Sequence, residues 1–168
     1  MPEIIILGGA NGAGKTSAAP LLFKRYTGSK EFVNADEIAR GLSPFNPERA
    51  AIAAGRLMIT RMRELIRRKE SFVVETTCSG LANVNVFQAR KNNGWTVSLL
   101  FLWLRHPRYR SSASRVGNLH RHYLPLANTA AVYDNTDRHP VLVVEKSEET
   151  GLQVYDRARW TKILEANA

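Results

Sequence analysis

The chain has 168 residues, a formal net charge of +9 and a hydrophobic fraction of 44%, which suits one globular domain over residues 1–168. No apolar run approaches the roughly 20 residues that a helix needs to cross a bilayer, so a membrane-spanning helix is excluded. A single cysteine, Cys78, excludes an internal disulfide, and the chain enters its first strand without a basic leader, so we expect a cytoplasmic protein.

The first expected element is a buried strand over Ile4 to Leu7, four consecutive apolar residues. It leads directly into a glycine-rich stretch that runs from Gly9 to Thr16 and has the spacing of the phosphate-binding loop G-x-x-x-x-G-K-[ST]. A helix is expected from Thr16 to Tyr26, kinked by Pro20. The strand, loop and helix together are the structural context in which this spacing is meaningful.

Each residue type in this stretch suits the binding of phosphate groups. Glycines allow positive φ and bring backbone N–H groups close to an anion, and the start of the following helix adds its positive dipole end. The Lys15 ammonium is expected to reach the outer phosphates, and the Thr16 hydroxyl is expected to ligate Mg²⁺. The predicted site consists of Gly9, Ala10, Asn11, Gly12, Ala13, Gly14, Lys15, Thr16 and Ser17.

Strands and helices alternate through the rest of the chain. Strands are expected over 31–34, 71–75, 95–104, 130–133 and 141–144, and helices over 37–40, 47–69, 83–92, 118–126 and 156–165, with a turn and return between 145 and 156. This alternation predicts an α/β fold, a parallel sheet with helices on both faces. Such a sheet binds ligands beyond the carboxyl ends of its strands.

Two carboxylates are expected at the same edge of the sheet as Lys15. Asp36 follows the second strand, and Glu75 ends the third. A carboxylate beside a γ-phosphate either accepts the proton of an attacking hydroxyl or helps to hold Mg²⁺. The structural alternatives are that Asp36 caps the following helix and that Glu75 is paired within the fold. Cys78 is interpreted as a small buried residue and not as a nucleophile.

The positive charge favours an anionic ligand without identifying it. Lys and Arg number 24 against 15 Asp and Glu, and the basic residues are spread along the chain with no tail or run of five. A substrate that carries phosphate groups accounts for this charge as well as nucleic acid does. A nucleic-acid partner is therefore the less favoured interpretation.

Three blocks of sequence, in order and at appropriate distances, resemble the zeta-toxin family of P-loop kinases. They are FVNADEIARGLSPFNPERAAIAAGRLM, FVVETTCSG and YLPLANTAAVYDNT, and the resemblance runs from about residue 4 to residue 144. It implies a nucleotide-kinase-like fold that binds ATP and Mg²⁺ and phosphorylates a hydroxyl group of a small molecule. Characterised toxins of the family phosphorylate UDP-N-acetylamino sugars and often occur with a small antitoxin, so the resemblance implies a UDP-sugar substrate and an antitoxin partner.

The resemblance also assigns roles to individual residues. Lys15 and Thr16 would hold the phosphates and Mg²⁺, and Asp36 would be the general base toward the substrate hydroxyl. The residues that it places at the substrate are Asp36, Glu75 and Thr77, and those that it places near the adenine are Asp134 and Asn135.

The chain departs from the family after Arg105, where the family continues into a long lid with repeated R-V and a G-G-H motif. Here the sequence passes almost at once to Arg108 and Tyr109, so the lid is shortened or missing. Arg108 matches the R-Y pair that ends the family lid and is the candidate catalytic arginine. Either the protein lacks the lid, or this sequence omits a segment between about Leu104 and Tyr109.

The shortened lid leaves two rivals to an active kinase of small molecules. The first is a nucleotide-binding protein with degenerate or no kinase activity, which the missing lid favours. The second is a kinase of nucleic-acid ends, which only the net charge favours.

Overall fold

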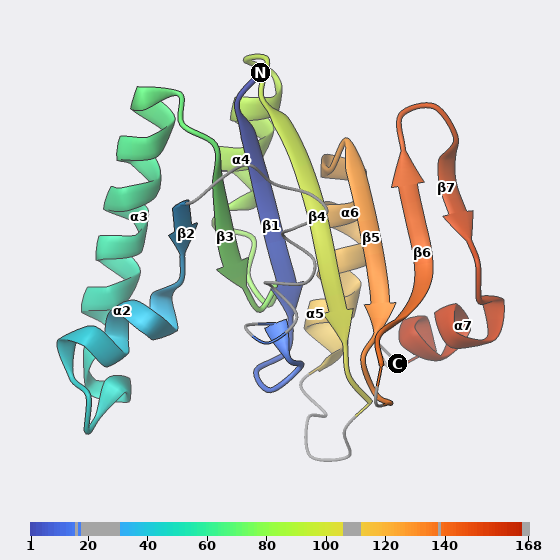
Figure 1. Ribbon diagram of the computed structural model, residues 1–168, viewed down its shortest axis with the longest axis horizontal. Helices are drawn as coiled ribbons and strands as arrows, with labels where there is room; N and C mark the ends of the chain where they lie inside the picture. Colours follow the sequence, from blue (N-terminus) through green and yellow to red (C-terminus); the bar gives the residue numbers. More distant parts are fainter. Residues whose placement is uncertain (16, 18–30, 106–111, 138, 166–168) are drawn as a thin grey trace.

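Seven strands form one sheet whose carboxyl edge carries the glycine-rich loop (Figure 1). The computed structural model describes residues 1–15, 17, 31–105, 112–137 and 139–165. The strands are β1 (Glu3–Gly9), β2 (Glu31–Val33), β3 (Phe72–Thr76), β4 (Thr96–Trp103), β5 (Thr129–Asp134), β6 (Val141–Ser147) and β7 (Gly151–Val154). Their order in the sheet is β2-β3-β1-β4-β5-β6-β7, so the run expected over 95–104 is the central strand.

The sheet is parallel from β2 to β5, as the alternation predicts, but antiparallel at β6 and β7. A parallel return requires a crossover of about a dozen residues or more. Only residues 135–140 separate β5 from β6, and only residues 148–150 separate β6 from β7. The expectation of a wholly parallel sheet is therefore wrong at β6, because so short a connection reverses the chain direction. The turn and return expected between 145 and 156 is confirmed as the antiparallel pairing of β6 and β7.

The helices occur close to their expected positions. They are α2 (Ala35–Leu42), the 3₁₀ turn η1 (Pro47–Ala50), α3 (Ala51–Arg68), α4 (Val84–Lys91), a continuous helical stretch of α5 (Ser112–Asn118), η2 (Leu119–Tyr123) and α6 (Leu124–Leu126), and α7 (Arg157–Glu165). The helix expected from residue 118 begins earlier, at Ser112. The sequence does not predict this start, because the serines before residue 118 interrupt any periodic pattern of apolar residues. The helix expected over 16–26 lies, apart from Ser17, outside the described residues.

Alternate residues of β1 face two separate clusters of buried side chains. Ile4 and Ile6 face the larger cluster, and Ile5 and Leu7 face the smaller one. The larger cluster receives side chains from α3, α4, the α5–α6 stretch and α7: Met58, Met62, Leu65, Phe87, Leu119, Tyr123, Trp160 and Ile163. Figure 1 shows α4, α5 and α6 on one side of the sheet. Across the described residues, every helix is too short or too polar to span a membrane.

Candidate active site

The loop after β1 takes backbone conformations that favour glycine, at positions with no room for a side chain. Gly9 has φ 144°, and a Cβ atom there would lie 2.4 Å from the carbonyl oxygen of Leu102 in β4. Gly14 has φ 78°, and its Cβ would lie 2.7 Å from the side-chain nitrogen of Asn135. The loop is therefore packed between β4 and the segment that follows β5.

Lys15 is nearly buried and is held by three oxygen atoms. Its Nζ donates to the carbonyl oxygens of Gly9 at 2.9 Å and Ala10 at 2.8 Å, and it lies 3.3 Å from Oε1 of Glu75. The side chains of Lys15 and Glu75 are only 4% and 10% exposed. An anion that enters the loop therefore competes for this ammonium with one carboxylate and two carbonyl groups.

Asn34 joins Glu75 to the first turn of α2. Its Nδ2 donates to Oε2 of Glu75 at 2.9 Å, and its Oδ1 accepts the N–H groups of Asp36 at 2.8 Å and Glu37 at 3.3 Å. Asn34 is thus the N-cap of α2, so the alternative that Asp36 caps this helix is wrong. Sequence reasoning does not identify Asn34 as a site residue, although an asparagine directly before a helix is a recognisable cap signal.

Asp36 lies where two cavities meet at the carboxyl edge of the sheet. The first, of about 220 Å³, is lined by Asn11, Lys15, Asn34, Asp36, Glu75 and Thr77, among others. The second, of about 410 Å³, shares Asn11 and Asp36 and continues past Arg40 and Glu48. The loop cation and the Asp36 carboxylate therefore share one cleft, and the second cavity leaves space beside Asp36 for another ligand.

A third cavity, of about 290 Å³, opens at the opposite ends of the same strands, around Glu3, Ser98 and Thr129. These three polar side chains bond one another, because the Ser98 hydroxyl donates to Glu3 and accepts from Thr129. This cavity also holds a cation and two carboxylates, Lys146, Glu3 and Glu145, but no residue of the glycine-rich loop lines it. We therefore place the candidate site at the carboxyl edge.

Burial shifts the protonation of two groups beside the loop. Burial raises the pKa of Glu75 above its usual value, and the Lys15 ammonium opposes this shift only in part. Burial also raises the pKa of the Cys78 thiol to about 12. Cys78 is therefore a protonated, buried thiol, which confirms its interpretation as a packing residue. A carboxylate with a shifted pKa in a cleft is typical of functional sites.

The cleft brings together several, but not all, of the predicted site residues. Thr77 lines the first cavity, where its hydroxyl pairs with that of Ser79 at 2.8 Å. Ser17 is exposed. Thr16 and Arg108 lie outside the described residues, so the magnesium ligand and the catalytic arginine stay predictions.

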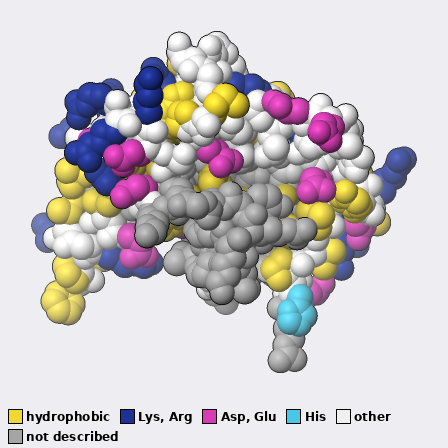
Figure 2. Space-filling model, turned by 45° about the horizontal axis from the view of Figure 1, so that its top comes forward, with side chains coloured by type: hydrophobic (Ala, Val, Ile, Leu, Met, Phe, Trp, Pro, Cys, Tyr) yellow, Lys and Arg dark blue, Asp and Glu magenta, His cyan; other side chains and the backbone are white. Residues whose placement is uncertain are grey.

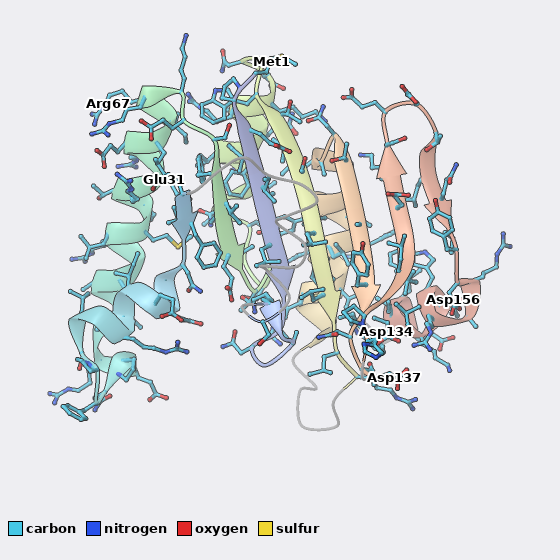
Figure 3. The ribbon with its side chains drawn as sticks, viewed as in Figure 1. Met1, Glu31, Arg67, Asp134, Asp137 and Asp156 are labelled. Carbon is cyan, nitrogen blue, oxygen red and sulfur yellow. The ribbon has the colours of Figure 1, made fainter. Side chains whose placement is uncertain are left out.

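The two residues expected near the adenine face different neighbours. The Asp134 carboxylate accepts from the Arg159 guanidinium of α7 at 2.6 Å and from the N–H of Thr136 at 3.0 Å. Asn135 instead reaches the loop, where its Nδ2 donates to the carbonyl oxygen of Ala13 at 2.8 Å. Figure 3 shows Asp134 beside Asp137 and Asp156, near α7. Their adenine contacts stay predictions, but Asp134 already has partners for both carboxylate oxygens.

Several known proteins are similar to this chain in fold. The crystal structure of AvrRxo1-ORF1:AvrRxo1-ORF2 with sulphate ions has a TM-score of 0.72 at 18% identity and covers 100% of this chain and 65% of that chain. The AvrRxo1-ORF1:-ORF2 structure with ATP has a TM-score of 0.68 at 18% identity, with the same coverage. The PezAT chromosomal toxin–antitoxin system of Streptococcus pneumoniae has a TM-score of 0.66 at 16% identity, over 99% of this chain and 84% of that chain. These likenesses confirm the P-loop kinase-like α/β fold.

The sequence comparisons agree with the structural ones. An uncharacterised protein of Haemophilus influenzae is 30% identical over 94 residues, which are 56% of this chain and 65% of the relative. The chain thus spans slightly less than two thirds of that relative and of the AvrRxo1 chain. The model of the family described as zeta toxin matches residues 1–167. Because this match takes in nearly the whole chain, the protein belongs to the zeta toxin family.

Proposed function

We propose that the chain is an ATP-dependent phosphotransferase that moves the γ-phosphate of ATP to a hydroxyl group of a small molecule, with residues 1–168 as one kinase domain. The observation that supports this best is the shared cleft of Lys15 and Asp36. A cation in a glycine-rich loop suits the phosphates of a nucleotide. A carboxylate beside a second cavity suits removal of a proton from an acceptor.

In the proposed reaction, Asp36 takes the proton from the acceptor hydroxyl. The oxygen of that hydroxyl forms a bond to the γ-phosphorus while the bond to the β–γ bridging oxygen breaks, and ADP leaves with that electron pair. Lys15 exchanges its two loop carbonyls for the outer phosphates and neutralises their charge. Glu75 and Thr77 contact the acceptor, with Glu75 held in place by Asn34.

Magnesium would be held mainly by the phosphates of the nucleotide. Within the described ranges, no three His, Cys, Asp or Glu side chains lie close enough together to hold a metal ion. Mg²⁺ commonly takes one or two protein oxygens together with phosphate oxygens. The Thr16 hydroxyl, and alternatively the Glu75 carboxylate, fits that requirement by chemistry. When bound, the ion would neutralise phosphate charge.

A transfer assay with a matched pair of variants tests the proposal. Asp36→Asn should keep ATP affinity within a few-fold and lower transfer by about 10²-fold or more, the usual effect of losing a general base. Glu37→Gln, one residue along the same helix turn and half-exposed, should leave transfer unchanged. UDP-N-acetylglucosamine is the first acceptor, followed by a metabolite screen for the mass gain of one phosphate. Normal turnover of folded Asp36→Asn would place the base elsewhere.

The two rival functions predict different results in the same assay. If the wild type binds ATP but no acceptor gains a phosphate, the chain is a nucleotide-binding protein without transfer activity. Transfer to a 5′-hydroxyl oligonucleotide would support a kinase of nucleic-acid ends. The surface gives that rival little support: Figure 2 shows the basic side chains over α3 next to acidic ones, and Arg61 and Arg68 pair with Glu31 and Glu64.

We also propose that the protein is cytoplasmic and that an antitoxin is its partner. The support is that PezAT is a toxin–antitoxin system and that AvrRxo1-ORF1 was solved in complex with a second chain. Expression of the wild type in bacteria should then arrest growth, whereas Asp36→Asn should not. Equal growth of the two strains at equal protein levels would argue against a toxin.

A further inference from the structure

We propose that Arg159 in α7 is a positioning residue for the phosphate-binding loop. Through Asp134 it fixes the turn that follows β5, and from this turn Asn135 holds the loop at Ala13 and Gly14. The inference rests on the proposed nucleotide binding of that loop, and it gives a role to the C-terminal helix, which lies beyond the three blocks of family resemblance.

The contacts that lead from α7 to the loop begin with the ion pair between Arg159 and Asp134, at the end of β5. Arg159 Nη1 donates to Asp134 Oδ2 at 2.6 Å, and Nε lies 3.1 Å from Oδ2 of Asp156. The Asp134 side chain is only 5% exposed, so its charge needs a close partner. Asp156 also accepts the backbone N–H of Arg159 at 2.9 Å, which fixes the guanidinium at the start of the helix. Arg159 is thus well placed to hold Asp134.

The second step is the turn itself. The remaining oxygen of Asp134, Oδ1, accepts the N–H of Thr136 at 3.0 Å. The N–H of Asn135 donates to the carbonyl of Trp103 at 2.7 Å, and the Thr136 hydroxyl accepts the N–H of Arg105 at 2.9 Å. The turn over 134–136 is therefore fixed on one side by α7 and on the other by the end of β4.

The third step is the contact between the turn and the loop. Asn135 Nδ2 donates to the Ala13 carbonyl at 2.8 Å. In a planar trans peptide the Ala13 carbonyl and the Gly14 N–H point in opposite directions. The bond from Asn135 therefore sets the direction of the Gly14 N–H, and backbone N–H groups are the donors with which such loops bind phosphate. A turn that moves would misdirect this donor.

Nucleotide titration of purified full-length variants tests the chain of contacts, with fluorescent ATP in the presence of Mg²⁺ and below the melting temperature of each variant. Arg159→Gln should weaken binding roughly 2- to 30-fold, the range for residues coupled to a site without touching its ligand. Arg159→Lys should recover part of the loss, because it keeps a cation beside Asp134. Arg157→Gln is the matched control, an exposed arginine two residues earlier in α7.

A double variant separates positioning of the loop from general stability. Asn135→Ala should weaken binding to a similar extent, and adding Arg159→Gln to it should cause little further loss, because both act through the same bond. In turnover, the variants should raise the KM for ATP while the KM for the acceptor stays at the wild-type value. If Arg159→Gln does not fold, Arg159→Lys and Asn135→Ala test the proposal instead.

Each result has one interpretation. Folded Arg159→Gln that binds the nucleotide as tightly as the wild type, or losses that add in the double variant, would overturn the positioning role while leaving the proposed function intact. A folded wild type that binds no nucleotide would overturn the proposed function and this inference together.

Discussion

Asn34 binds Glu75 and caps α2 with the same side-chain amide. The nitrogen donates to Glu75 Oε2 at 2.9 Å, and the oxygen accepts the N–H of Asp36 at 2.8 Å. The amide therefore fixes the two carboxylates of the candidate site relative to each other, because Asp36 belongs to the first turn of the helix that it caps.

Substitutions of Asn34 should separate these two roles. Asn34→Ala should lower the free energy of unfolding by about 1 kcal/mol, the usual effect of losing a cap. Asn34→Asp keeps a good cap but faces Glu75 with a like charge and no donor. Its loss of turnover should therefore be larger than its loss of stability explains. Thermal melts and turnover per folded molecule measure the two effects. Wild-type turnover of Asn34→Asp would show that the bond to Glu75 has no part in the reaction.

Glu75 should make stability depend on pH in a predictable direction. Burial raises its folded-state pKa above the ordinary 4.5, so its contribution to stability is fully present below about pH 4.5 and is lost as the pH rises through the folded-state pKa. The melting temperature of Glu75→Gln relative to the wild type should therefore increase as the pH rises above about 4.5. Acceptor use should fall in the same variant while ATP binding is largely kept.

The Glu149→Gln variant is the control for Glu75, because Glu149 is exposed in the turn between β6 and β7, away from the cleft, and the melting temperature of this variant should follow the wild type as the pH changes. A difference between Glu75→Gln and wild type that is independent of pH would contradict the raised pKa. Selective loss of Mg²⁺ affinity in Glu75→Gln would instead assign Glu75 to the metal.

Removal of the Lys15 ammonium should weaken binding of Mg²⁺ and ATP and abolish transfer, because the main positive charge toward the outer phosphates is lost. Fluorescent-nucleotide titration of Lys15→Ala measures this. Lys162→Ala, an exposed lysine of α7, changes the net charge equally and should bind as the wild type does. Equal affinity and equal turnover of Lys15→Ala would remove Lys15 from the site.

The short segment after β4 should limit the rate of transfer. One arginine that neutralises the moving phosphate contributes about 10³–10⁵ in rate, so a chain without the family lid should turn over slowly, and Arg108→Ala should lower the remaining rate without changing ATP affinity. For the 168-residue chain we expect an intact mass of 18.8 kDa, allowing for any tag. A mass larger by a few kilodaltons, with G-G-H peptides in a digest, would show that the lid is present.

The sequence best predicts the structural features that depend on residues close together in the chain. The apolar run over 4–7 and the glycine spacing after it locate β1 and the loop, and the end of β2 locates Asp36. The direction of β6 is not predictable from its own residues, because the apolar run over 141–144 is the same in a parallel or an antiparallel strand. Only the short connection over 135–140 contains that information.

Contacts between distant elements were beyond sequence reasoning for a related reason. Arg159 and Asp134 are 25 residues apart, and they meet only because α7 packs against β6, the neighbour of β5 in the sheet. The bond between Asn34 and Glu75 spans 41 residues and depends on β2 and β3 being neighbours. Local patterns predict which edge of the sheet the carboxylates occupy, but not which side chain holds each of them.

Cys78 lies directly beneath the start of the loop. A Cβ atom on Gly8 would stand 2.7 Å from its Sγ, and Asn118 binds its carbonyl oxygen at 3.0 Å. Burial raises the pKa of this thiol, so the reactive thiolate is scarce in the folded protein, and no side-chain surface is open to a reagent. Alkylation of Cys78 therefore requires that the structure around it opens locally. The rate at which a reagent alkylates the single cysteine of the chain therefore measures how often the structure beneath the phosphate-binding loop opens.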